Sequence, residues 1–86
     1  MTTHYPQGAR NALLAGDIGK TRYLRKKARI VAVEMNEYFT VDTDRGMMNG
    51  SPGDFLVTND PRDDAGSDLW TISRERLEAT YEDDTE

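Results

Sequence analysis

The sequence contains no cysteine, which excludes disulfide bonds and thiolate metal sites. It also contains no apolar run that approaches the roughly 20 residues of a membrane-spanning helix. The opening segment Met1–Tyr5 lacks the basic and apolar regions of a signal peptide. We therefore expect a cytoplasmic protein that does not contact a membrane.

Histidine is nearly absent as well, since His4 is the only one in the chain. A Ser/His/Asp triad needs a histidine that is held against a serine and oriented by a carboxylate, and no pattern around His4 provides this. The acidic residues Glu34 and Glu37 are an odd number of positions apart, which places them on opposite faces of a strand unless the turn at Asn36 intervenes. We therefore predict that the protein has no catalytic residues and is not an enzyme.

The aspartates do not form a convincing metal motif. The spacing of Asp42 and Asp44 resembles the start of a calcium loop, but the sixth and twelfth positions hold Met47 and Gly53 instead of glycine and glutamate. A second acidic group has the composition of an ordinary turn, and it consists of Asp60, Asp63, Asp64 and Asp68. We therefore predict no metal site and no cofactor.

The 86 residues are enough for one small domain, which buries only about 60–65% of the surface of its unfolded chain. The net charge of −5 hides a strong asymmetry, since residues 1–33 hold seven basic side chains and one acidic one. The remaining residues, 34–86, hold four basic and fifteen acidic side chains. The two parts can attract each other within one molecule or between copies, or the basic part can face an acidic or phosphate-rich partner.

The strongest folding signal is the stretch 51–57, Ser-Pro-Gly-Asp-Phe-Leu-Val. Pro52 fixes the φ angle that suits the second position of a turn, and Gly53 tolerates the positive φ that follows. Asp54 is placed to accept a hydrogen bond within the turn. We expect Phe55 and Val57 to begin a buried strand and to face the core.

Other segments alternate between strand and turn signals. Residues 28–35 predict a central strand, because apolar residues lie on both of its faces. A short helix is expected over residues 9–15, and Ser73 is a suitable N-cap for a helical turn through Leu77. Extended segments are expected at 21–24, 38–41, 47–48, 54–58, 68–72 and 79–81.

The fold class predicted from this pattern is mainly β (α+β). Short strands with turns every 8–12 residues favour a small antiparallel β-roll or barrel of about five strands, with a short N-terminal helix and a C-terminal helical turn. We expect residues 1–20 to form an N-terminal arm that carries the short helix. Residues 21–82 form the β-rich domain, and residues 83–86 form a disordered acidic tail.

Three pieces of the chain occur in an order that resembles a known family. They are Tyr-Leu-Arg-Lys-Lys-Ala-Arg-Ile-Val-Ala-Val at 23–33, Pro-Gly-Asp-Phe-Leu-Val at 52–57, and Ile-Ser-Arg-Glu-Arg-Leu-Glu-Ala-Thr-Tyr-Glu at 72–82. Together they resemble the small phage and bacterial proteins named for a Pro-Gly-Asp-Tyr motif, over roughly residues 22–82. Phe55 stands where that family usually has Tyr, Leu77 where it has Phe, and the loop 59–67 is longer.

The resemblance implies a compact β-rich domain that is often virus-encoded, located in the host cytoplasm or in a virion. It implies no activity and supplies no functional residues. Our leading hypothesis is a non-enzymatic binding or assembly module that contacts a protein partner or a second copy, either as a structural virion component or as an accessory factor that blocks a host protein. The expected partner-binding residues are Leu13, Leu14, Lys20, Arg22, Tyr23, Arg25, Lys26, Lys27 and Arg29.

Two alternatives remain open. The first is a nucleic-acid-binding protein in which residues 20–29 contact phosphates and Tyr23 stacks on a base, although a sequence pI near 4.8 opposes general nucleic-acid affinity. The second is a pocket for a small anionic, nucleotide-like ligand. A simpler interpretation of the basic run is a solvated strand end that balances the acidic part. If Met47 and Met48 alternate as in a strand, one faces inward and the other is free to meet a partner.

Overall fold

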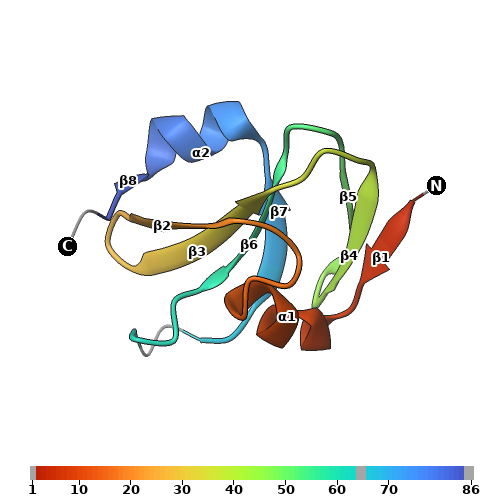
Figure 1. Cartoon of the computed structure of the whole chain (residues 1–86), viewed down its shortest axis with the longest axis horizontal. Coiled ribbons are helices and arrows are strands. Elements are labelled where there is room, and N and C mark those ends of the chain that lie inside the picture. Colours follow the sequence, from red (N-terminus) through yellow and green to blue (C-terminus); the bar gives the residue numbers. More distant parts are fainter. Residues whose placement is uncertain (1, 64–65, 85–86) are drawn as a thin grey trace.

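The computed structural model describes residues 2–63 and 66–84, which form two β-sheets and two α-helices (Figure 1). The elements follow one another as β1 (Thr3–Tyr5), the 3-10 turn η1 (Gln7–Ala9), α1 (Arg10–Leu14), β2 (Thr21–Arg25), β3 (Arg29–Glu34), β4 (Phe39–Thr43), β5 (Gly46–Gly50), β6 (Phe55–Asn59), β7 (Leu69–Ile72), α2 (Arg74–Thr80) and β8 (Glu82–Asp83). The predicted fold class, mainly β with two short helices, is confirmed.

The larger sheet is antiparallel and has the strand order β7-β6-β3-β2-β8. The smaller sheet has the order β1-β4-β5, and β1 runs parallel to β4. No strand pairing joins the two sheets within the described residues, so they do not form a closed barrel there. Strand β3 lies at the centre of the larger sheet, as its apolar residues on both faces predict.

Two apolar clusters lie on opposite faces of the larger sheet. Helix α2 covers one face, where Leu77 packs with Leu24, Ile30, Ala32, Phe55 and Val57. The smaller sheet and α1 cover the other face, where the buried residues are Leu13, Val31, Val33, Met35, Phe39, Val41, Leu56 and Leu69. Side chains therefore alternate along β3 between two cores, which makes this strand the axis of the fold.

The predicted turn before β6 is confirmed. Gly53 has a φ of +94°, and the Asp54 Oδ2 atom accepts a hydrogen bond of 2.9 Å from the Ser51 N–H. The Gly53 N–H donates to the Met35 carbonyl at 2.7 Å, which ties the turn to the end of β3. Phe55 and Val57 then face the core beneath α2, as expected.

The segment predicted as an N-terminal arm is instead part of the domain. Strand β1 pairs with β4 from Thr3 to Tyr5. The Gln7 side chain accepts a hydrogen bond from the Leu69 N–H at 2.9 Å and donates to the Leu69 carbonyl at 2.9 Å. It also donates to the Asp42 carbonyl, so one amide joins both sheets. These partners lie far away in the chain, and local sequence gives no sign of them.

The acidic C-terminus also differs from the prediction. Helix α2 continues to Thr80, Glu82 and Asp83 form strand β8 against β2, and the Asp84 side chain is almost fully buried. Residues 85 and 86 of the predicted disordered tail lie outside the described residues. The predicted cap of α2 is confirmed, because the Ser73 Oγ atom accepts a hydrogen bond of 3.2 Å from the Arg76 N–H.

Candidate functional site

The arginines of the predicted basic run are engaged by acidic side chains of the same molecule. The Arg22 Nε atom donates to Asp83 at 2.9 Å and its Nη2 atom donates to Glu78 at 3.2 Å. Arg25 lies 3.7 Å from the Glu82 carboxylate. These pairs match the simpler interpretation, in which the basic run balances the acidic part of the chain.

Arg29 continues the same pattern at the other end of the run. It pairs with Asp63 at 3.5 Å and with Asp84 at 3.4 Å. Lys20, Lys26 and Lys27, by contrast, form no ion pair with any other residue in the described part of the chain. Within the described residues, Arg22, Arg25 and Arg29 are therefore the basic side chains of residues 1–33 that pair with carboxylates of the same molecule.

The apolar members of the predicted site have different surroundings. Leu13 is completely buried, and Leu14 is half-buried against the same cluster. Helix α1 thus docks on its own sheet, and Leu13 offers no surface to a partner. Tyr23 is 42% exposed, but the Arg62 guanidinium lies 5.6 Å from its ring centroid and covers one face of the ring.

Two buried carboxylates, one of them from the acidic group considered above as a turn, form ion pairs with the half-exposed Arg62. Arg62 contacts Asp60 at 2.6 Å and Asp84 at 3.1 Å, and the side chains of both aspartates are only 1% exposed. The Asp84 Oδ1 atom is buried and has no hydrogen-bond partner among the described residues. The network ties Asp84, which follows β8, to the segment after β6 and to Arg29 of β3, and so has a structural role.

This network makes the stability of the folded protein depend on pH at the acidic end of the scale. The hydrogen bonds from the Arg62 side chain hold the pKa of Asp60 below its ordinary value of 3.8. At acidic pH the Asp60 carboxylate therefore binds a proton more readily in the unfolded state than in the folded state. The stability that this ion pair contributes is complete above about pH 4, and it is lost as the pH falls through the pKa of Asp60 in the folded state. We expect Asp60→Asn to flatten the fall of Tm below about pH 4, measured by circular dichroism.

The matched control for this prediction is Asp44→Asn, which changes an exposed aspartate that has no ion pair in the described chain. This variant should keep the acid dependence of the unchanged protein. Parallel curves for all three proteins would contradict a role for Asp60 in acid stability.

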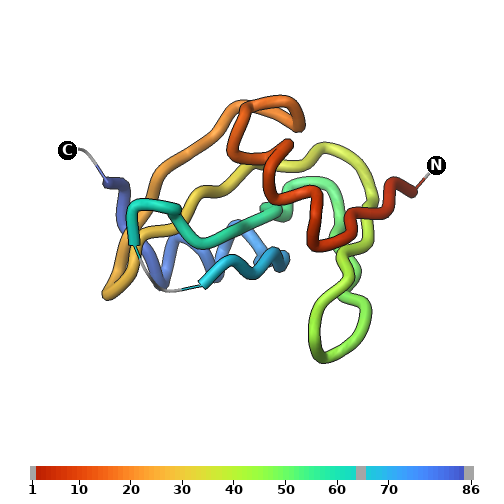
Figure 2. Tube along the Cα trace, turned by 90° about the horizontal axis from the view of Figure 1, so that it is seen from below, coloured from red at the N-terminus to blue at the C-terminus, as the bar shows by residue number. Residues whose placement is uncertain are grey.

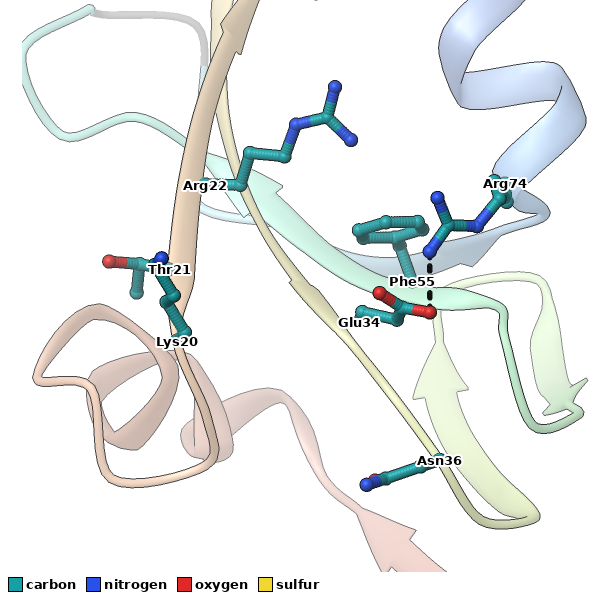
Figure 3. A pocket seen from close by; sticks show the side chains of 7 residues that line it. All are labelled: Lys20, Thr21, Arg22, Glu34, Asn36, Phe55 and Arg74. Atoms are coloured by element: carbon teal, nitrogen blue, oxygen red, sulfur yellow. Dashed lines mark ion pairs between the residues drawn. The ribbon is translucent and has the colours of Figure 1, made fainter.

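A hollow of about 600 Å³ lies between β2 and α2 (Figure 3). Its lining residues are Lys20, Thr21, Arg22, Glu34, Asn36, Phe55 and Arg74. The Cζ atoms of Arg22 and Arg74 lie 5.9 Å and 5.5 Å from the Phe55 ring centroid. Arg74 also pairs with Glu34 at 2.5 Å.

Two further hollows adjoin where the smaller sheet meets the edge of the larger one. They measure about 460 Å³ and 420 Å³, and both are lined by Met48 of β5 and Trp70 of β7. We call them together the Met48–Trp70 groove. Ile72 adds apolar surface, and the charged residues that line the groove are Asp44, Arg45, Asp54, Asp68 and Arg76.

Strand β5 presents an unusual edge to this groove. It is the outer strand of the smaller sheet, and no strand pairing joins it to β7 within the described residues. It contains neither a charged residue nor a proline over Gly46–Gly50, although natural proteins commonly use these to protect a free edge. The turn between β4 and β5 projects away from the rest of the chain, as the yellow-green loop in Figure 2 shows.

The two methionines of β5 are both exposed, Met47 to 61% and Met48 to 38%. Met48 lies opposite the buried Val41 and so shares the core-facing side of the smaller sheet, although it stays partly exposed, whereas Met47 lies on the other face. Only Gly50 is buried in this strand, because the Phe39 ring of β4 occupies the space beneath it. The uncharged run Gly-Met-Met-Asn-Gly was the sequence signal for this surface, and its partner Trp70 could not be linked to it without the topology.

Comparisons of the chain with known family models, curated proteins and solved structures gave no match. The resemblance to the Pro-Gly-Asp-Tyr proteins therefore stays a prediction. Within the described residues, no helix is long and apolar enough to cross a membrane. In that same part of the chain, no group of three or more His, Cys, Asp or Glu side chains could hold a metal ion.

Proposed function

We propose that this protein is a non-enzymatic binding module that takes an extended segment of a protein partner into the Met48–Trp70 groove. The observation that carries the proposal is the uncharged edge of β5, which has no strand pairing on its outer side within the described residues, beside a hollow that Met48, Trp70 and Ile72 line together with polar and charged side chains. As the resemblance implies, we place this module in an infected host cell or in a virion.

Strand addition explains how such a segment would bind. The backbone groups on the outer edge of β5 supply hydrogen bonds to an added strand, and pockets for alternate side chains supply specificity. Trp70 and Met48 offer apolar contacts of the kind that dominate binding energy at interfaces, and the charged lining residues offer the polar contacts that such sites also use. The unbranched, flexible Met47 and Met48 side chains can adapt to the partner's shape.

The predicted basic run is a weaker candidate for the same role. A nucleic acid or an acidic partner at residues 20–29 would compete with the carboxylates that already pair with Arg22, Arg25 and Arg29. The Met48–Trp70 groove involves no such competition at its strand edge, because that edge is unpaired within the described residues. The two sites therefore predict different contact positions on the protein surface.

Site-specific photocrosslinking distinguishes the Met48–Trp70 groove from the basic run at residues 20–29. A photoreactive phenylalanine analogue replaces Met47 in one variant and Tyr23 in the other, and both positions are exposed. We expect crosslinks in the native host from position 47 and none from position 23. Mass spectrometry of the product should identify one contiguous segment of the partner.

Three other results would count against the proposal. Crosslinks from position 23 alone would favour the basic run, and crosslinks to DNA or RNA would favour the nucleic-acid alternative. A crosslinked dimer of this chain from position 47 would show that a second copy occupies the edge of β5 in place of a different partner.

A further inference from the structure

We propose that the hollow between β2 and α2 is a separate site that binds a small molecule carrying a phosphate group. It shares no lining residue with the Met48–Trp70 groove, so this inference does not depend on the proposed function. Its volume of about 600 Å³ lies within the range of roughly 300–1,000 Å³ that small-molecule pockets occupy.

Three cationic side chains line this hollow in a chain whose net charge is −5. Figure 3 shows Arg22 reaching in from β2 and Arg74 from the start of α2, with the Phe55 ring between them. Lys20 adds a third cation, and Glu34 is the only carboxylate in the lining. The lining residues therefore carry more positive than negative charge, and the carboxylates of Asp83 and Glu78, which pair with Arg22 from outside the lining, offset part of it.

The guanidinium groups of Arg22 and Arg74 are held in place and still have N–H donors that bind no acceptor among the described residues. Both lie within cation–π distance of the Phe55 ring, which is almost fully buried, and each pairs with acidic residues of the chain. Arg22 uses its Nε and Nη2 atoms for Asp83 and Glu78, so its Nη1 atom has no partner among the described residues. Preorganised guanidinium groups lose less freedom when an anion binds.

Phosphate is the ligand chemistry that fits these donors best. A guanidinium binds phosphate oxygens with charge-assisted, often bidentate hydrogen bonds, and a lysine adds a point charge. The Glu34 carboxylate lies 2.5 Å from Arg74. It occupies the place where a phosphate group would bind, so the ligand has to displace it. Glu34 therefore limits the affinity, and its removal should strengthen binding.

Isothermal titration calorimetry with inorganic pyrophosphate tests the site. We expect Glu34→Gln to tighten binding by about tenfold, and Lys20→Gln and Arg74→Gln each to weaken it by about tenfold, as loss of a hydrogen bond to a charged group does. Lys27→Gln removes the same charge as Lys20→Gln from an exposed position outside the hollow, and it should change the affinity by less than about twofold.

A second titration with succinate separates phosphate from carboxylate recognition, and binding of succinate alone would overturn the choice of ligand. Absence of pyrophosphate binding at low salt would overturn the site itself. An equal effect of Lys20→Gln and Lys27→Gln, with none from Glu34→Gln, would show general charge attraction and would also overturn it. Circular dichroism of each variant confirms that the fold is kept.

Discussion

We expect replacement of Leu13 by alanine to lower the free energy of unfolding by about 2–5 kcal/mol. Leu13 is completely buried among Val31, Val33 and Leu56 in the cluster beneath α1. Truncation removes the transfer free energy of its side chain and leaves a cavity that the β3 and β6 residues can only partly fill. Small domains have about 5–15 kcal/mol of total stability, so this single change removes a large share of it.

Urea denaturation followed by circular dichroism measures this loss. The exposed residue Asn11 lies on the same helix, and Asn11→Ala serves as the control, with an expected change within about 0.5 kcal/mol. The result also decides between two roles for Leu13. A partner-contact leucine on a loose arm could be truncated without loss of stability, so an unchanged midpoint for Leu13→Ala would contradict the docking of α1.

We expect replacement of Gly50 by alanine to destabilise the protein by about 1–3 kcal/mol or more, which is the usual cost of overpacking a core. A Cβ atom at this position would lie 2.1 Å from the Cζ atom of Phe39. The Phe39 ring is buried and has Tyr5 edge-on against it, with 6.1 Å between the ring centroids. The ring therefore has little room to move aside.

A double-mutant cycle tests whether this contact is the cause. Phe39→Leu removes most of the ring, so Gly50→Ala should cost less in that background, with a coupling energy of about 0.5–3 kcal/mol. The control is Gly8→Ala, because a Cβ atom there meets nothing within 4 Å. Additive effects of the two substitutions would mean that Gly50 does not lie beneath the Phe39 ring.

Much of the fold was predictable because its signals are local. The Pro52–Gly53 turn, the Ser73 cap and the apolar residues on both faces of β3 each depend on neighbouring residues, and each is confirmed. β1 and β8 were missed because they are short and their pairing partners lie far away in sequence. The hydrogen bonds by which Gln7 joins the two sheets were missed for the same reason, because their partners lie on β4 and β7.

The candidate sites were less predictable than the fold. The basic run was visible as composition, but composition did not show which carboxylates would neutralise Arg22, Arg25 and Arg29. Met47 and Met48 were visible as possible contacts, yet the groove needs Trp70 beside them. A groove between two sheets exists only once the topology is known.

Hydrogen exchange on the complex with the crosslinked partner tests the central claim most directly. In the free protein, β5 amides that do not bond to β4 should exchange rapidly, because β5 is the outer strand of its sheet within the described residues. An added strand should slow the exchange of these amides and leave the amides of Lys26 and Lys27 unchanged. Unchanged exchange in β5, with slower exchange at Lys26 and Lys27, would contradict binding at the Met48–Trp70 groove.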